Sequence, residues 1–253
     1  MLFLLIQRRL SLLDKSLPKS SLRILILTPV WKRPEITEAY CLGILRLKQT
    51  FNIDVLCVCS PEDPTHNTLI LEKYGIEYVL FENKLGKKKN FGLQEAFKRD
   101  WDYLLEMNSD DIIKDELIET YLELMEQGVP FIGMGNFVFY NSETGESKEC
   151  TFKDSMTIFG IGRAYKREVI EDKKLWDDEA DYGMDNHSER VLMKDKIYAR
   201  IITTEEPLAF DIKSQVNIWS YDKMPGKPYL TGKLFMGLSE AEIQHLNGLR
   251  KDY

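Results

Sequence analysis

Residues 101–111 read Trp-Asp-Tyr-Leu-Leu-Glu-Met-Asn-Ser-Asp-Asp, and this stretch decides the fold that we expect. Its apolar run at residues 103–105 is typical of a strand buried in a parallel sheet. The run is soon followed by oxygen-bearing side chains, those of Asn108, Ser109, Asp110 and Asp111. Because ligands of open α/β sheets bind at the carboxyl ends of the strands, these residues mark a candidate binding site.

Two interpretations of the adjacent Asp110 and Asp111 follow from the sequence. Neighbouring carboxylates repel one another unless they share a cation, and a hard divalent ion that also binds a diphosphate meets that need. Alternatively, one aspartate N-caps a helix predicted over residues 112–127, which Gly128 and Pro130 would end. Both interpretations stay open, since one aspartate can cap while its neighbour binds the ion.

The composition is that of an ordinary globular chain. It has 253 residues, of which 43% are hydrophobic and 30% charged, and a formal net charge of −7. These values fit one α/β domain and argue against disorder, a coiled coil and wholesale coating of a nucleic-acid backbone. The cysteines form neither a CxxC pair nor a Cys/His zinc pattern, which favours reduced core cysteines in a cytosolic protein.

The N-terminal segment is apolar over residues 1–6, which is too short to span a bilayer, and Arg8 and Arg9 follow directly. A signal peptide would carry its charges before the apolar residues. We therefore expect an amphipathic helix over residues 2–17, within an N-terminal unit of residues 1–22, and no transmembrane segment. The helix is expected to dock on the body of a cytoplasmic protein, with attachment to a membrane surface as the alternative.

Strands and helices are predicted to alternate along the first half of the chain. Apolar runs at residues 23–28, 53–59 and 76–81 precede the strand around Leu104, and segments with helical spacing separate them. Pro34 suits the first turn of the first of these helices. The alternation predicts βαβ units and a mainly parallel central sheet with flanking helices.

The alternation weakens after Val129. Further strands are predicted at residues 131–140, 152–161, 197–203 and 208–212. Helices are expected at residues 165–173 and around Leu192. Residues 221–232 contain two prolines and two glycines and are expected to form a loop or lid, and Ser239 begins a capping box for the last helix.

Two more segments carry candidate functional groups. Residues 84–90 place four lysines and a glycine at a strand-to-helix junction, where amides and lysines hold a diphosphate well; a solvated basic turn is the alternative. Residues 183–190 read Gly-Met-Asp-Asn-His-Ser-Glu-Arg. Here Asp185 is either a helix N-cap or a general base, and His187 lies close enough in sequence to be a metal ligand or a substrate contact.

Together these segments resemble glycosyltransferases of the GT-A fold, closest in pattern to the large family 2. That family has a glycine, a basic residue followed by Asn-x-Gly, a helix, a strand and then Asp-x-Asp. This chain has Gly86, then Lys89-Asn90-Phe91-Gly92, a predicted helix and strand, and residues 108–111. Asn108 stands where an aspartate is usual, which shifts the expected metal contact to Asp110. The match covers residues 23–190.

The resemblance implies a set of site residues. The donor contacts that it implies are Pro29, Trp31, Arg33, Glu62, Asp63, Gly86, Lys89, Asn90, Ser109 and Lys213. The implied ligands of a Mn²⁺ or Mg²⁺ cofactor are Asp110, Asp111 and His187. Asp185 is the implied catalytic base, with Asp181 or Asp178 as fallbacks. Lys213 and residues 216–219 would close over the donor, and Trp176 and Tyr182 would either stack on a sugar or pack in the core.

The implied activity is inverting transfer of a sugar from a nucleotide diphosphate sugar, a UDP-sugar being favoured, to an acceptor hydroxyl. The acceptor would be a glycan, a lipid-linked molecule or a nucleic acid. A GT-A domain is expected over residues 23–212, with a donor half at 23–111 and an acceptor half at 112–212. A short C-terminal extension, residues 213–253, would supply a loop or lid and a helix.

Three other classes of protein remain. A nucleotidyltransferase shares the fold, but its glycine-rich signature after the first strand is absent. A catalytically inactive GT-A module that binds a partner is possible if Asn108 marks a degraded metal site. The same chemistry with a hydroxylated DNA base as acceptor is the third. The sequence does not name the sugar, the acceptor or the oligomeric state.

Overall fold

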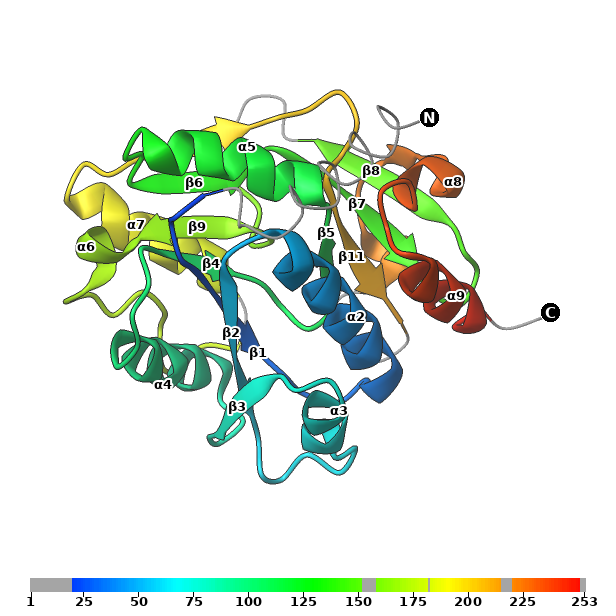
Figure 1. The fold of residues 1–253 in the computed structure, drawn as a ribbon, viewed down its shortest axis with the longest axis horizontal. Helices are drawn as coiled ribbons and strands as arrows, with labels where there is room; N and C mark the ends of the chain where they lie inside the picture. Colours follow the sequence, from blue (N-terminus) through cyan, green and yellow to red (C-terminus); the bar gives the residue numbers. More distant parts are fainter. Residues whose placement is uncertain (1–19, 152–157, 182, 215–219, 251–253) are drawn as a thin grey trace, which may run out of the picture.

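The computed structural model describes residues 20–151, 158–181, 183–214 and 220–250 (Figure 1). The predicted N-terminal helix, Tyr182, residues 216–219 and most of the strand expected at 152–161 lie outside the described residues. Among the described helices, none has both the length and the apolar content that crossing a membrane requires.

A seven-stranded central sheet dominates the structure, with the strand order β10-β6-β9-β4-β1-β2-β3. Its strands are Ile24–Pro29 (β1), Ile53–Cys59 (β2), Glu77–Leu80 (β3), Tyr103–Glu106 (β4), Phe131–Met134 (β6), Arg163–Lys166 (β9) and Arg200–Ile202 (β10). Every neighbouring pair is parallel except the two pairs that involve β9. The predicted α/β class with a mainly parallel sheet is therefore confirmed.

Helices cover both faces of this sheet (Figure 1). The main ones are Pro34–Thr50 (α2), Asn67–Lys73 (α3), Leu85–Phe97 (α4), Asp115–Glu126 (α5), Arg167–Ile170 (α6) and Met184–Lys194 (α7). Side chains alternate along β1, so that Ile24 and Ile26 pack with α2 and α5, while Leu25 and Leu27 pack with α4 and α7. A strand buried on both faces explains why its sequence reads as an apolar run.

A second sheet lies beside the first, to its right in Figure 1, with the order β12-β8-β7-β11-β5. Its strands are Asp111–Ile113 (β5), Asn136–Asn141 (β7), Ser147–Thr151 (β8), Ala209–Lys213 (β11) and Lys227–Pro228 (β12). A third apolar core joins β5, β7 and β11 to α2 and to the C-terminal helices Thr231–Leu234 (α8) and Glu240–Gly248 (α9). Arg46 of α2 pairs with Glu242 of α9 at 2.9 Å, so the C-terminal residues are packed into the body of the protein.

Several boundaries differ from the sequence-based prediction. The helix expected over residues 112–127 begins only at Asp115, because residues 111–113 form β5 and pair with β11. The strand expected over residues 131–140 divides at Gly135 into β6 and β7, which belong to different sheets. A Cβ at Gly135 would lie 2.3 Å from the Thr203 Oγ1, which shows how closely the chains pass at this division.

Two predicted segments in the second half also need correction. The helix expected over residues 165–173 shortens to α6, because residues 163–166 form the antiparallel strand β9. Residues 221–232 contain the 3₁₀ helix Tyr221–Lys223 (η1), strand β12 and the start of α8, rather than a continuous loop. The capping box at Ser239 is confirmed, with the hydroxyl accepting a hydrogen bond from the Glu242 amide.

Candidate functional site

Three carboxylates, two buried and one half-buried, meet where the two sheets adjoin. Asp110 and Asp111 follow β4, and Asp211 comes from β11, whose antiparallel register places it opposite Asp111. The amide of Ile212 also donates to the Asp110 carbonyl at 2.8 Å, which holds the two segments together. One oxygen from each carboxylate lies within 4.8 Å of the others, and each offers a ligand to a shared cation.

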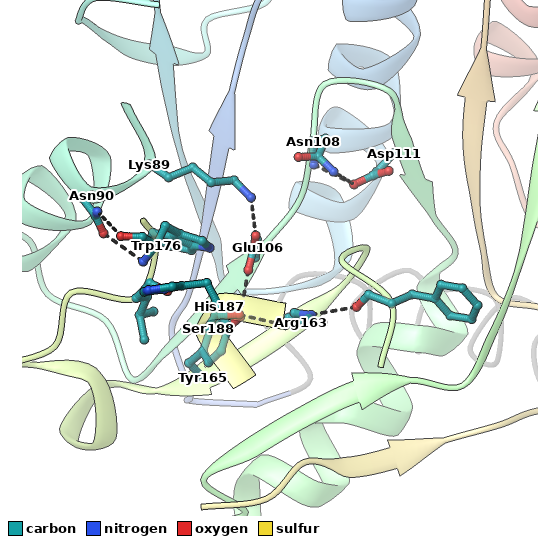
Figure 2. A network of polar contacts seen from close by, with 12 residues as sticks. Lys89, Asn90, Glu106, Asn108, Asp111, Arg163, Tyr165, Trp176, His187 and Ser188 are labelled. Atoms are coloured by element: carbon teal, nitrogen blue, oxygen red, sulfur yellow. Dashed lines mark hydrogen bonds and ion pairs between the residues drawn. The ribbon is translucent and has the colours of Figure 1, made fainter. Parts of the chain in front are cut away.

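Neither Asp110 nor Asp111 caps the helix that follows, so that alternative is wrong. The N-cap residue of α5 is Lys114, and no side chain caps this helix. The Asp111 carboxylate instead accepts hydrogen bonds from the Asn108 backbone amide at 2.6 Å and from its side-chain amide at 3.1 Å (Figure 2). Asn108 therefore orients a carboxylate of the cluster, which gives this departure from the family pattern a definite role.

Two cations face the three carboxylates. Arg33 Nη1 lies 2.6 Å from Asp110 Oδ2, and Lys213 Nζ lies 2.6 Å from Asp211 Oδ2. Arg33 reaches the cluster from the turn between β1 and α2, and Lys213 shares a strand face with Asp211, two residues earlier. Both basic residues were predicted as donor contacts. The structure places Arg33 beside Asp110, a predicted metal ligand, and Lys213 beside Asp211, which was not predicted.

The oxygen atoms of the cluster are incompletely satisfied by the protein. The buried Ser109 Oγ and Asp211 Oδ1 have no hydrogen-bond partner among the described residues. Unpaired buried polar atoms are rare, and they call for a ligand, an ion or water. A hard divalent cation takes oxygen ligands, so the residues present fit a Mg²⁺ or Mn²⁺ ion.

Burial and mutual repulsion make two of the three carboxylates, Asp111 and Asp211, bind protons tightly. Burial raises the pKa of Asp111 well above its ordinary value, and the charges of Asp110 and Asp211 raise it further. Burial also raises the pKa of Asp211 to about 6, against the lowering effect of Lys213. Burial opposes ionisation of Asp110 as well, but Arg33 and Lys213 outweigh it and hold the pKa of Asp110 below its ordinary value.

These pKa shifts predict the pH dependence of cation binding. A divalent ion needs ionised carboxylates and must displace any bound proton, so its affinity rises with pH. With the pKa of Asp211 at about 6, we expect Mn²⁺ affinity at pH 5 to be about tenfold or more below that at pH 7. Calorimetric titrations of Mn²⁺ at pH 5, 6, 7 and 8 measure this. An affinity that is flat across this range would contradict the assignment.

Lys89 belongs to a second buried polar network, separate from the three carboxylates (Figure 2). Its ammonium pairs with Glu106 at the end of β4, and Glu106 also accepts a hydrogen bond from the Tyr165 hydroxyl at 2.8 Å. Ser188 Oγ lies 3.3 Å from the Tyr165 hydroxyl oxygen, to which it can donate, and it accepts a hydrogen bond from Arg163 Nη1 at 2.8 Å. This network ties α4, β4 and β9 to α7. Direct contact between Lys89 and a donor stays a prediction.

The glycine and asparagine of the α4 motif hold the loop at residues 175–181. A Cβ at Gly86 would lie 1.6 Å from the Asp177 carbonyl oxygen, so only glycine allows this contact. Asn90 Nδ2 donates to the Trp176 carbonyl at 2.7 Å and to Asp178 at 2.8 Å. The first backbone amide of α4, that of Leu85, donates a hydrogen bond to the Asp181 carboxylate at 3.1 Å. The N-terminus of α4 thus binds the protein's own carboxylate.

Asp63 shapes the turn that carries Arg33. Its carboxylate accepts hydrogen bonds from the Lys32 amide at 2.9 Å and from Asn67 Nδ2 at 2.7 Å. Burial opposes ionisation of Asp63, but its hydrogen bonds, which include two from Thr65, hold its pKa below the ordinary value. The neighbouring Glu62 is exposed and accepts from the Asn83 amide.

The tip of β1 carries the other predicted donor residues. Pro29 is the last residue of β1, and Trp31 lies partly exposed in the turn that follows. The Lys32 and Lys88 ammonium groups lie 5.3 Å and 5.7 Å from the centre of the Trp31 ring. Burial lowers the pKa of Lys88 to about 8, and its ammonium donates to the Val30 carbonyl at 2.7 Å. Lys88 is one of the four lysines of residues 84–90 that the sequence analysis named as a group.

The predicted base and the predicted histidine ligand both lie on α7. Gly183, in the left-handed region, is the N-cap residue of this helix, so Asp185 is not the N-cap; its side chain lies outside the described part of the structure. His187 Nδ1 lies 2.9 Å from the Leu175 carbonyl oxygen, and its role as a metal ligand stays a prediction. Trp176 is fully buried, which fits packing rather than contact with a sugar.

Asp211 and Glu106 are the site residues that the sequence analysis missed. Glu106 is an acid within the otherwise apolar strand run, which is an unusual position for an unpaired carboxylate and a usable signal. Asp211 lies 100 positions beyond Asp111 in sequence and reaches the cluster only through pairing of β5 with β11. Its one local signal is the spacing to Lys213, which puts both side chains on one face of a strand.

Comparison with known proteins identifies the fold but no family. No protein-family model matches the chain, and a search of curated proteins gives no match. The structure is similar to that of S. aureus TarS 1-349, with a TM-score of 0.54 and 15% identity over 76% of this chain and 60% of that one. A second S. aureus TarS structure gives a TM-score of 0.51 and 13% identity over 76% of this chain and 37% of the other.

The chain thus spans less than two thirds of the length of these TarS chains. A weaker likeness, with a TM-score of 0.46 and 15% identity, is to CMP:2-keto-3-deoxy-manno-octonic acid synthetase complexed with CTP, over 72% of this chain and 90% of that one. The similarity to TarS confirms the predicted GT-A-like fold. Membership of family 2 stays a prediction.

Proposed function

We propose that the chain is a glycosyltransferase that uses a nucleotide diphosphate sugar and a divalent cation held by Asp110, Asp111 and Asp211. The observation that carries this proposal is the group of three carboxylates beyond the carboxyl end of β4, in which Asp211 Oδ1 is unsatisfied among the described residues, as is the neighbouring Ser109 Oγ. The GT-A-like fold supports it, because TarS is a glycosyltransferase with this fold. The carboxyl end of the central strands is also where α/β sheets bind nucleotides.

In this proposal, charged groups bind the diphosphate of the donor and stabilise it as the leaving group. The cation, Mn²⁺ or Mg²⁺, would neutralise charge that develops on the diphosphate leaving group. Arg33 and Lys213 lie beside its ligands and would hold the donor's phosphates. Asp185 would remove the proton from the acceptor hydroxyl, which then displaces the diphosphate from the anomeric carbon. A single displacement of this kind inverts that carbon.

The buried network around Glu106 would hold α7, which carries Asp185, in position relative to α4. It connects α4 with α7, the helix on which Asp185 lies, through Glu106, Tyr165 and Ser188. Fully paired buried networks fix side chains and helices in one arrangement. Lys89 and Glu106 are thus proposed as residues that position α7.

A catalytically inactive binding module is the alternative class of protein. The sequence argument for that class loses its basis in the arrangement of the cluster. That argument was the replacement of an aspartate by Asn108. Asn108 orients the Asp111 carboxylate, and Asp211 supplies the third carboxylate. The cluster therefore has three acidic side chains without an acid at position 108.

A thermal-melting screen tests the proposed function. The full chain is melted with UDP-, GDP- and CDP-sugars, each in Mn²⁺ and in EDTA. A donor at one hundred times its Kd stabilises the folded state by roughly 2.7 kcal/mol, so we expect a clear rise in Tm with UDP-sugars in Mn²⁺ that EDTA removes. If no nucleotide sugar stabilises the protein in either condition, the transferase proposal fails.

A further inference from the structure

One close ion pair in the carboxylate cluster joins two groups that the proposed activity needs separately. Arg33 Nη1 lies 2.6 Å from Asp110 Oδ2, and the two side chains are only 16% and 10% exposed. A cation that takes Asp110 as a ligand must compete with this guanidinium for the carboxylate. A phosphate that takes Arg33 must in turn compete with the carboxylate.

Backbone contacts fix the turn that presents Arg33. Both Lys32 and Arg33 have φ of 56°, in the left-handed region that residues with a Cβ rarely adopt. The Lys32 amide donates to Asp63 at 2.9 Å, and the Lys32 carbonyl accepts from Asn67 Nδ2 at 2.9 Å. Such strained conformations persist only where their surroundings hold them, and they gather at binding sites. The backbone is therefore fixed while the long Arg33 side chain keeps its rotatable bonds.

The remaining carboxylates are held differently. Asp211 has an internal cation too, since Lys213 Nζ lies 2.6 Å from it. The Asp111 carboxylate is oriented by the neutral Asn108 instead. Lys213 is two residues from Asp211 on the same strand and stays near it by geometry. Arg33 comes from a turn that is distant in sequence from Asp110. Of the two basic residues, Arg33 is therefore the one whose side chain can leave its carboxylate.

We propose that Arg33 couples cation binding to donor binding, an inference that rests on the proposed function. In the free protein the guanidinium neutralises Asp110 and opposes entry of a divalent cation. A nucleoside diphosphate offers the guanidinium a better partner, because arginine binds phosphate through two parallel hydrogen bonds. Asp110 is then released to the cation. The cation and the diphosphate each strengthen binding of the other, and the strengthening is reciprocal.

The coupling makes a distinctive prediction for variants that lack the guanidinium. Arg33→Gln removes the competitor of the cation, so Mn²⁺ alone is expected to bind more tightly than it does to the parent, by about tenfold. The same variant has lost a phosphate contact, so UDP alone is expected to bind more weakly. A residue with a merely structural role would weaken both ligands or neither.

Calorimetry of the full chain at pH 8 measures these affinities. Mn²⁺ is titrated with and without saturating UDP into the parent, Arg33→Gln, Arg33→Met and Arg99→Gln. Arg99 pairs with Glu77 in a more exposed ion pair outside the cluster and is the matched control. Melting in EDTA establishes that each variant is folded, and Arg33→Met keeps the length of the stem if the glutamine variant does not fold.

The parent and Arg99→Gln are expected to bind Mn²⁺ at least about fivefold more tightly with UDP than without it. Both Arg33 variants are expected to show little or no such gain. If they keep the parent's gain, the coupling role of Arg33 is overturned and the proposed function stands. If UDP has no effect on Mn²⁺ binding to the parent and does not bind by itself, both the coupling and the proposed function fail.

Discussion

Asp110→Asn is expected to abolish Mn²⁺-dependent binding of a nucleoside diphosphate and to slow sugar transfer by roughly a thousandfold. Asp110 lies in the turn between β4 and β5, and Arg33 and Lys213 keep its carboxylate ionised despite burial. Asparagine has nearly the same shape but carries no charge, so the cation loses one of three anionic ligands. The measurement is the rise in Tm with UDP and Mn²⁺, followed by the transfer rate.

Asp54→Asn is the control for that experiment. Asp54 is an exposed aspartate on β2, and its loss removes the same charge from the chain without touching the cluster. We expect the control to keep the full rise in Tm. An Asp110→Asn variant that UDP and Mn²⁺ stabilise as well as the parent would show that the cation does not need Asp110.

Asp185→Asn is expected to keep donor binding and to lower the transfer rate by about 10²–10⁴-fold, the range typical of a removed general base. Asp185 is the second residue of α7 and does not serve as its N-cap, so its replacement leaves the start of the helix intact. The measurements are the Tm rise with donor and Mn²⁺ and the rate of sugar transfer. A loss of transfer with intact binding separates the base from the metal ligands.

Asp195→Asn, at the opposite end of α7, is the matched control, because the half-exposed Asp195 side chain pairs with Lys173, away from the carboxylate cluster. It should transfer sugar at the parent's rate. Unchanged transfer in Asp185→Asn would move the base elsewhere. The fallbacks Asp181 and Asp178 already bind Leu85 N and Asn90 Nδ2, so they hold the loop against α4.

Those parts of the fold that depend on local sequence could be predicted. The strand at residues 53–59 has the predicted bounds, Pro34 begins α2, and the Ser239 capping box opens α9. In each case the signal and the structure lie within a few residues of one another. An apolar run, a proline at the first turn and a serine with a glutamate three residues on are sufficient.

Those parts that depend on pairing across the chain could not be predicted. Residues 111–113 continue naturally into a helix by local propensity, and only their register with β11 makes them a strand. The same pairing brings Asp211 to the cluster. Without it, Asp111 looks like an N-cap, because aspartates before helices usually are. The one missed pairing thus explains both the wrong helix start and the missing ligand.

The sequence predicted which residues form the candidate site better than it predicted which residues they contact. Asp110, Asp111, Arg33 and Lys213 were all named and do lie together. Lys89 was predicted as a donor contact, which stays a prediction; the sequence did not indicate that its ammonium pairs with Glu106. A sequence shows which groups carry charge, but the choice of partner depends on the burial of each group. Burial makes an ion pair between Lys89 and Glu106 necessary for both.

The central claim is that the three-carboxylate cluster holds a divalent cation that carries a nucleotide diphosphate. Titration of Mn²⁺ into the full chain with saturating UDP, followed by calorimetry, tests it most directly. The account predicts saturable binding of one Mn²⁺ per chain that Asp110→Asn abolishes. Binding that is absent from the parent, or unchanged in Asp110→Asn, would contradict it.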